Sequence, residues 1–343
     1  MVRARMDKDA DRLHQQRLAG WRITFVVTFG FVVAELIGWP LAFIVPLLAV
    51  QFLAVLPRAP TLRQGLVIVV VMTATTFVAL FAAEWLLPRP GAYTVLLFGF
   101  FALGFYLDRF AATRPVAILL LISSATIPIV NIQDSFVGAA LRDTLVYGAI
   151  SALLLAWLAH AIFPARLAAG QAVEQPRPAA GPFFLVAAAI LLLPVVLFLS
   201  KPDEASLPLL MTTLSVLRQA EGGLGERMAA GLLLGNIIGG IAAIIGYFVL
   251  TLFPFFASLC LVLLAAGLWF GGKIAASGVR APVFVVGLMT FIVLLGLGLI
   301  SISEGSSAAF ISRIGGVLVG AIYSLGALIL LGGVGRTVPS GPH

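Results

Sequence analysis

Apolar residues fill long runs of the chain, and short segments rich in Arg, Pro and Gly separate these runs. A helix that crosses a bilayer needs about 20 apolar residues, and the pattern predicts about twelve such helices. In the first half they are expected at residues 22–38, 41–56, 65–87, 92–107, 115–132 and 138–163. In the second half they are expected at residues 182–200, 205–217, 228–252, 255–271, 281–301 and 308–333. The pattern therefore predicts an all-α integral membrane protein.

The two halves of the chain resemble each other in sequence. Pro46-Leu47-Leu48 recurs as Pro208-Leu209-Leu210, and Arg142 near the start of one run has a counterpart in Arg313. Each half contains an even number of expected helices, so both halves enter and leave on the same face of the membrane. This predicts two parallel six-helix repeats, an arrangement typical of transporters that hold a site between two related halves.

Basic residues are distributed unevenly over the loops. With the amino terminus in the cytoplasm, all but four of the 21 Lys and Arg residues fall on the cytoplasmic side, as the positive-inside rule requires. The exceptions are Arg89, Arg142, Lys201 and Arg313. The predicted organisation is a cytoplasmic basic segment (1–21), a first repeat (22–163), a cytoplasmic linker (164–181), a second repeat (182–333) and a cytoplasmic tail (334–343).

The composition narrows the class of protein. The 343 residues are 61% hydrophobic and only 10% charged, far from the roughly 25% charged residues of soluble domains. The net charge of +7 is explained by the topology signal and predicts no nucleic-acid partner. One cysteine and three scattered histidines predict no metal site, and no combination of acid, base and nucleophile indicates an enzyme or a cofactor.

The second run of each half is short, and a proline, Pro46 or Pro208, is expected to break its helix. Short or broken helices at matching positions in two halves indicate a binding site, because helix ends offer backbone groups to a ligand. Gln51 in one copy, and Thr212 and Thr213 in the other, are therefore expected to line a substrate path. Alternatively, these polar groups hold helices together.

Glu35 is the candidate for proton coupling. It lies about 20 Å along the first helix from Arg22, near the outer end of the span. A buried acid in a membrane protein can take up a proton on one side and release it on the other. Two alternatives are a water-exposed interfacial carboxylate and an ion-pair partner of an outer arginine.

Four further polar residues are candidates for the path. Arg142-Asp143 and Arg313 enter the membrane at the start of the last helix of each half. Two related guanidiniums would form a positive mouth suited to carboxylates, whereas ion pairing at the lipid boundary is the alternative. Asn236 lies mid-membrane on a helix with Gly231, Gly235 and Gly239, where close packing of helices is the main expectation and a pore-lining role is the exception.

Two passages resemble a known family. Trp39-Pro40, Gln51 and Thr61-Leu62-Arg63-Gln64-Gly65, together with Arg227 and Gly235-Asn236-Ile237-Ile238-Gly239-Gly240, are similar to the fusaric-acid-resistance superfamily, which includes aromatic-acid exporters. The resemblance implies efflux of aromatic or other organic acids across a bacterial inner membrane. It also implies a small organic anion as substrate and a periplasmic HlyD-type adaptor as partner. A second copy of the chain, in a homo-oligomer, is a further candidate partner, and the sequence leaves the oligomeric state open.

The chain departs from that family at two points. It has only the linker and a short tail where the exporters carry sizeable cytoplasmic domains, and Thr73-Ala74-Thr75-Thr76 stands where a Gly-rich patch is expected. The expected function is a proton-driven transporter of a minimal, membrane-only branch, surrounded by lipid. The alternatives are a passive organic-anion channel, a major-facilitator-type transporter, faintly indicated by Gly104-Phe105-Tyr106-Leu107-Asp108-Arg109, and a membrane scaffold.

Overall fold

The computed structural model describes residues 2–39, 41–55, 58–110, 113–133, 135–164, 182–201, 206–220, 226–303 and 307–332. These residues form twelve α-helices and one short 3-10 turn, with no strand among them. The elements are α1 (Val2–Leu36), α2 (Ile44–Val55), α3 (Leu62–Leu86), α4 (Pro90–Asp108), α5 (Arg114–Gln133), α6 (Ser135–Ile162), α7 (Phe183–Ser200), α8 (Ser206–Ala220), α9 (Glu226–Leu252), α10 (Phe256–Ala276), η1 (Gly278–Arg280), α11 (Ala281–Ser303) and α12 (Ser307–Gly332).

Ten of these helices are long and apolar enough to cross a membrane, and α2 and α8 are the two shorter apolar helices. The prediction of an all-α protein with many apolar helices of membrane-spanning length is therefore confirmed, but the described residues contain ten such helices and not the predicted twelve. Most helices begin and end within a few residues of the predicted runs, because a bilayer fixes their length. The exception is α1, which begins at Val2 rather than near residue 22, so its basic first half continues the same helix. The expected linker lies almost entirely outside the described residues.

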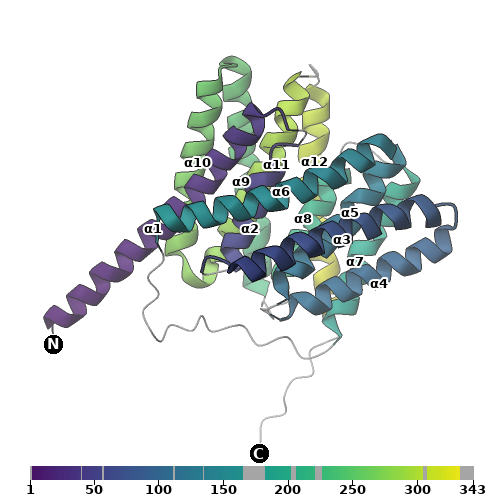
Figure 1. Cartoon of the computed structure of the whole chain (residues 1–343), viewed down its shortest axis with the longest axis horizontal. Helices are drawn as coiled ribbons and strands as arrows, with labels where there is room; N and C mark the ends of the chain where they lie inside the picture. The colour runs from purple at the N-terminus through teal and green to yellow at the C-terminus, as the bar shows by residue number, and fades with distance from the viewer. Residues whose placement is uncertain are drawn as a thin grey trace, which may run out of the picture.

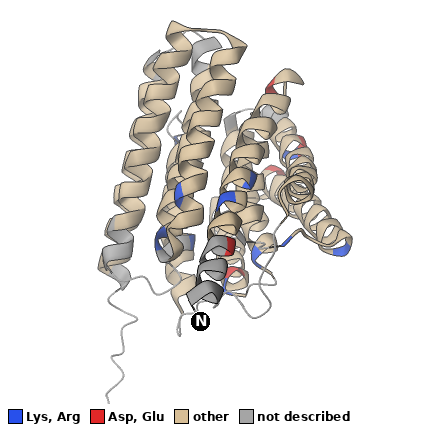
Figure 2. Ribbon diagram, turned by 90° about the vertical axis from the view of Figure 1, so that its left-hand side faces the viewer, with Lys and Arg blue, Asp and Glu red and all other residues tan. Residues whose placement is uncertain are grey.

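Short connections join most consecutive helices, so the odd-numbered helices begin at one end of the bundle and the even-numbered helices end there. The start of α7 lies at this end too, because Phe184 packs edge-on against Tyr106 near the end of α4. Most of the described Lys and Arg residues lie here, and we call it the basic end; the other is the opposite end. In Figure 2 the blue Lys and Arg residues lie mostly in the lower half of the bundle.

The first and last six helices pack against each other by a reciprocal pattern. Helix α1 packs along α10, and α4 packs along α7. Within each set, α2 packs on α6 as α8 packs on α12, and α3 packs on α5 as α9 packs on α11. Figure 1 shows α3, α4 and α5 mostly in the right half of the view, with α6 running above them from right to left, and α9 to α12 in the upper left and centre.

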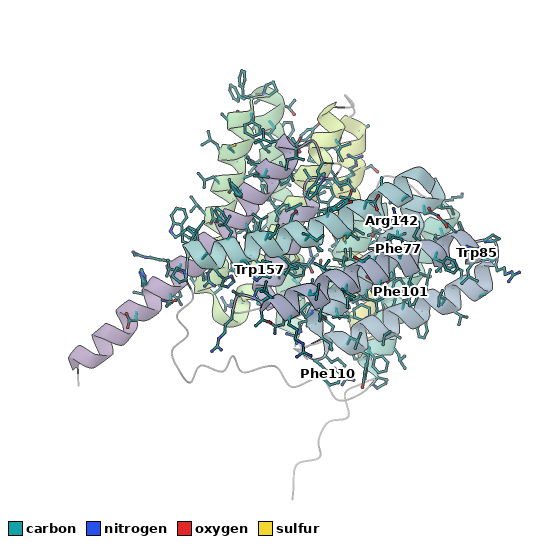
Figure 3. All side chains as sticks on the ribbon, in the orientation of Figure 1. Phe77, Trp85, Phe101, Phe110, Arg142 and Trp157 are labelled. Atoms are coloured by element: carbon teal, nitrogen blue, oxygen red, sulfur yellow. The ribbon has the colours of Figure 1, made fainter. Side chains whose placement is uncertain are left out.

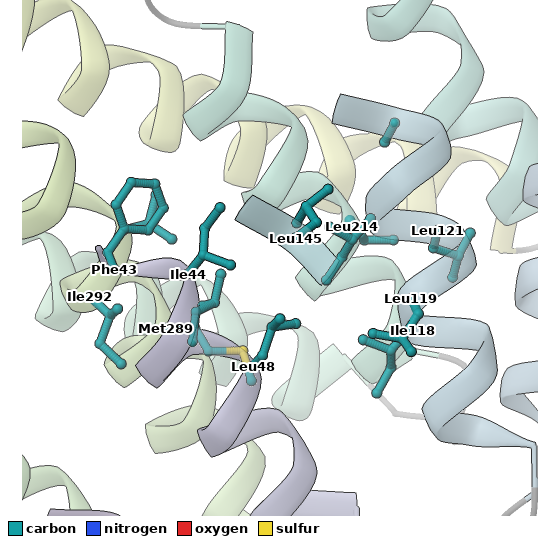
Figure 4. Close-up of a cluster of buried hydrophobic side chains, with 14 of the residues drawn as sticks. Phe43, Ile44, Leu48, Ile118, Leu119, Leu121, Leu145, Leu214, Met289 and Ile292 are labelled. Atoms are coloured by element: carbon teal, nitrogen blue, oxygen red, sulfur yellow. The ribbon is translucent and has the colours of Figure 1, made fainter. Parts of the chain in front are cut away.

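Helices α5 and α11 form the centre of the bundle. In the most apolar 18-residue stretch of each helix, 89% of the α5 stretch and 83% of the α11 stretch is buried. The corresponding share is 28% in both α4 and α10, so these two helices present most of their surface to the lipid. Figure 4 shows the buried side chains where α2, α5, α6, α8 and α11 meet, among them Phe43, Leu48, Leu145 and Leu214. The central contact between the two sets of helices is thus built from the short helices and the two most buried long ones.

Glycines let α9 and α11 touch backbone to backbone. A Cβ atom placed on Gly235 would collide with the carbonyl of Val283, and one on Gly239 would collide with the carbonyl of Gly287. Gly287 in turn faces the carbonyl oxygen of Gly235, 2.8 Å from an ideal Cβ position. Small residues four positions apart, as Gly235 and Gly239 are, permit such close approach of helices in membrane proteins. Close packing is what the sequence predicted for this helix.

The short helices are not broken by their prolines, contrary to the prediction. Pro46 is the third residue of α2, and Pro208 is the third residue of α8. The amide groups of the first turn have no partner within a helix, so a proline there removes no hydrogen bond. Before α2, the connection from α1 makes the sharp turn instead, with Gly38 at a φ of 72° and Leu41 at a φ of 57°. Both prolines therefore begin helices rather than interrupt them.

Candidate functional site

A cavity of about 360 Å³ opens between the two sets of helices at the opposite end of the bundle. Its walls come from the ends of α1, α5 and α11, the first turns of α6, and the connection between α1 and α2. Glu35 and Thr144 are the residues with polar side-chain oxygens in this wall, and Phe31, Trp39 and Phe43 are its aromatic residues. The cavity is therefore an apolar, aromatic pocket with one carboxylate.

A narrower apolar space continues from the cavity toward the middle of the bundle. It holds about 30 Å³, and Leu41, Phe43 and Leu141 belong to the walls of both spaces. Residues of α2, α5, α6, α8 and α11 enclose it, including Met211 on α8 and Thr126 on α5. Four residues that line this space are labelled in Figure 4: Phe43, Ile44, Leu48 and Leu145. The two spaces together lead from the opposite end to the contact between the halves.

A buried ion pair lies beyond this space, at the basic end. The guanidinium of Arg218 on α8 donates two hydrogen bonds to the Asp108 carboxylate at the end of α4, from Nε to Oδ2 at 3.1 Å and from Nη2 to Oδ1 at 3.2 Å. Its Nη1 donates a third to Oε1 of Gln51 on α2, also at 3.1 Å. The exposed side-chain fractions are 13% for Arg218 and 5% for Asp108. This network ties the first six helices to the last six.

The turn after α4 holds Asp108 in place. Nε of Arg114 donates to the backbone carbonyl of Asp108 at 3.1 Å, and the hydroxyl of Thr113 donates to the carbonyl of Leu107 at 2.7 Å. Both side chains stabilise the free carbonyls that end every helix. The geometry of the ion pair is therefore fixed from the start of α5 as well as from α8.

Arg142 lies on the side of α6 that faces α3. Its Nε and Nη2 donate to the Asp143 carboxylate at 2.8 and 2.7 Å, and its guanidinium carbon lies 4.7 Å from the centre of the Phe77 ring. Figure 3 shows Arg142 beside Phe77. Neither Arg142 nor Asp143 belongs to the cavity wall, although Leu141 and Thr144 on the same helix do.

Arg313 lies buried on α12 and turns toward α11. It is 8% exposed, and its Nη1 donates to the backbone carbonyl of Leu297 at 2.5 Å. Arg142 contacts α3, Arg313 contacts α11, and neither residue lines the cavity. The structure therefore does not bring the two arginines together around one mouth. The alternative of an ion pair at the lipid boundary would join Arg313 to Glu304, which lies outside the described residues.

The remaining polar candidates make contacts between helices. Asn236 Oδ1 accepts from the Thr290 hydroxyl on α11 at 2.6 Å, next to the glycine contact of α9 and α11. The Thr213 hydroxyl donates to the carbonyl of Gly320 on α12 at 3.4 Å, and Thr212 is 5% exposed. Among the candidates on the short helices, only Gln51 belongs to the ion-pair network.

Sequence reasoning missed Asp108 and Arg218 as site residues. Arg218 counted only as a basic residue of the cytoplasmic side, and Asp108 counted only as part of a signature at an unusual position. One signal was available: Asp108 is one of only 14 acidic residues and ends an apolar helix. Its partner is 110 residues away along the chain, so the pairing itself needed the fold.

No group of three His, Cys, Asp or Glu residues within the described parts of the chain is arranged to hold a metal ion. Residues 267–273, which resemble part of a phosphate-binding loop, lie within the continuous helix α10. Their glycines pack against α1, where Gly271 meets Gly20 and Gly267 meets Thr24.

Comparison with known proteins identifies one similar family. A family model described as a protein of unknown function, DUF2955, matches residues 20–161, which correspond to the spans of α1 to α6. This description names no activity and does not name the exporter superfamily. No curated protein and no solved structure matches the chain.

Proposed function

We propose that this protein is a membrane transporter that moves a small organic molecule along a path between its first six and last six helices. The observation that carries the proposal is the cavity at one end of this contact and the buried Asp108–Arg218 pair at the other. A path that is open at one end and closed at the other is the form expected of one state of an alternating-access cycle. We name Asp108, Arg218 and Gln51 the inner gate.

The reciprocal packing of the helices supports two parallel repeats related by a two-fold axis along the membrane normal. The first helix of each six packs along the fourth helix of the other, and the short helix packs on the last helix of its own six. The match of one family model to six helices alone, over residues 20–161, supports the same division. Rocking of two such halves would open the inner gate and close the cavity.

The excess of Lys and Arg at the basic end supports a cytoplasmic position for that end. The cavity would then face outward, and Glu35 would exchange protons with the outer compartment. Efflux across a bacterial inner membrane follows from the resemblance to exporters, as do an organic acid as substrate and a periplasmic adaptor or a second copy as partner. The orientation, the direction of transport, the substrate and the partners can each be tested separately from transport itself.

A labelling experiment tests the orientation. Arg89→Cys lies in the connection between α3 and α4 at the opposite end, and Ser277→Cys lies after α10 at the basic end. With Cys260→Ser as background, a membrane-impermeant maleimide should label position 89 in intact cells. It should label position 277 only after the membrane is permeabilised. The reverse pattern would place the cavity on the cytoplasmic side.

Transport is tested with the full chain in proteoliposomes carrying an imposed pH gradient. The probes are matched aromatic compounds that differ in charge: an acid, an amine and a neutral amide. We expect protein-dependent accumulation of at least one probe against its own concentration gradient, and its loss when an uncoupler collapses the pH gradient. Movement that is only downhill and insensitive to pH would favour the passive channel. No protein-dependent movement of any probe would overturn the transport proposal.

A further inference from the structure

We propose that the outward cavity binds an aromatic or otherwise apolar organic cation, with the Glu35 carboxylate as its counter-ion. This inference rests on the proposed transport function and deepens it by naming the charge of the substrate. It departs from the organic anion that the family resemblance implies. The observation that carries it is the chemistry of the cavity wall, in which the charged side chain is an acid.

The wall combines the two groups that recognise ammonium ions. Glu35 supplies a negative charge, and Phe31, Trp39 and Phe43 supply aromatic rings. A cation is attracted to the face of an aromatic ring, most strongly to that of Trp, and this attraction grows when water is excluded. A carboxylate at the mouth of an apolar space also draws cations toward it before they bind. An organic anion would meet repulsion at the same place.

The end of α1 adds to the negative potential. Glu35 is the penultimate residue of α1, which ends at Leu36, and the last turn contains no basic residue. The carbonyl groups at the C-terminal end of a helix carry a partial negative charge, which disfavours an acid there and favours a cation. A bound ammonium group would offset both the carboxylate and the helix end.

The cationic side chains on helices next to the cavity do not line it, although Arg313 contacts Leu297, a residue that lines the narrower space. Arg142 on α6 pairs with Asp143 and stacks on Phe77 of α3, and Arg313 on α12 donates to the carbonyl of Leu297. Helix α5 has one charged residue, Arg114, which lies at the basic end, and helix α11 has none. Glu35 therefore sets the charge preference of the residues that line the cavity.

The size of the cavity and the position of Glu35 indicate how binding and coupling combine. A space of about 360 Å³ lies at the small end of the range for small-molecule sites, which fits one aromatic ring with a short cationic group. A proton and an organic cation neutralise the same carboxylate, so they compete for it. Exchange of one for the other would couple proton entry to efflux of the cation.

The test compares two probes of similar shape and opposite permanent charge, benzyltrimethylammonium and benzylsulfonate, by isothermal titration calorimetry with the purified full chain. We expect the cation to bind at least about tenfold more tightly than the anion, a difference that one partly desolvated charge contact supplies. Glu35→Gln should remove this preference, and Glu35→Asp should keep it. Lowering the pH should weaken binding of the cation to the native protein and not to Glu35→Gln.

Glu84→Gln is the matched control, because Glu84 is an exposed acid near the end of α3 that does not line the cavity. It should bind both probes as the native protein does, and all variants should elute as a single folded species. Tighter binding of benzylsulfonate, or equal binding that Glu35→Gln leaves unchanged, would overturn the cation site. Gradient-driven movement of an acid alone would also overturn it while leaving transport in place. Cation binding without movement of any probe would remove transport and leave the site.

Discussion

Asp108→Leu alone should destabilise the protein strongly, whereas Asp108→Leu combined with Arg218→Met should restore most of its stability. Removing one partner of a buried ion pair leaves the other charge without compensation and costs about 3–5 kcal/mol. In the single variant, the Arg218 guanidinium would keep Gln51 as its partner and lose both bonds to the carboxylate. The double variant replaces the pair with apolar side chains of similar size, which is often neutral. The free energy of unfolding, measured by SDS titration in mixed micelles, checks this.

The double variant also separates a gate from a structural tie. An inner gate must form and separate during each cycle, so an apolar pair that stabilises the closed contact should abolish gradient-driven transport in proteoliposomes. A purely structural pair would leave the transport rate of the stable double variant unchanged. That result would contradict the gate while leaving the transport proposal intact, because some other contact would then close the basic end.

The pair of Arg142 and Asp143 provides the control for the stability measurement. Its side chains are 22% and 53% exposed, in contrast to the 13% and 5% of Arg218 and Asp108. Exposed ion pairs contribute about 0–1 kcal/mol. Asp143→Asn should therefore change the free energy of unfolding by at most about 1 kcal/mol. A loss as large as that of Asp108→Leu would show that exposure does not distinguish the two pairs.

The positions of the helices were predictable because the bilayer imposes a length and an apolar character on each span. This constraint is local, so α11 (Ala281–Ser303) nearly coincides with its predicted run of 281–301. The constraint ends at the membrane surface, where α1 continues through polar residues back to Val2. The effect of Pro46 was mispredicted because its cost depends on where the helix begins, which the apolar run did not reveal.

The site was predictable only in part. Glu35 was singled out as an acid near the outer end of the first apolar run, and it lines the cavity as an exposed residue. Gln51 was singled out by its place on a short helix, and it contacts Arg218. The partners of Arg142 and Arg313 depend on which helix each one faces, and the predicted repeat does not determine that. Tertiary packing turns Arg142 toward α3 and Arg313 toward α11.

The glycine contact between α9 and α11 should be as sensitive as the ion pair. A Cβ atom on Gly239 would overlap the carbonyl of Gly287 and would lie 3.0 Å from its Cα atom. Both obstacles are backbone atoms, so no side-chain rotation relieves them and the two helices must separate. Overpacking of a close contact costs about 1–3 kcal/mol, and we expect Gly239→Ala to reach the upper end, about 3 kcal/mol, because separation also weakens the neighbouring contact at Gly235.

Gly240→Ala is the matched control for this substitution. Gly240 is the next residue of the same helix, and the nearest atom to its added Cβ would be Cδ1 of Leu294 at 4.0 Å, an ordinary van der Waals contact. The same chemical change should therefore leave stability unaltered or raise it slightly, because alanine favours a helix over glycine by about 1 kcal/mol. SDS titration of the two variants in parallel measures the difference. Equal stability of Gly239→Ala and Gly240→Ala would mean that α9 and α11 do not approach each other as closely as described.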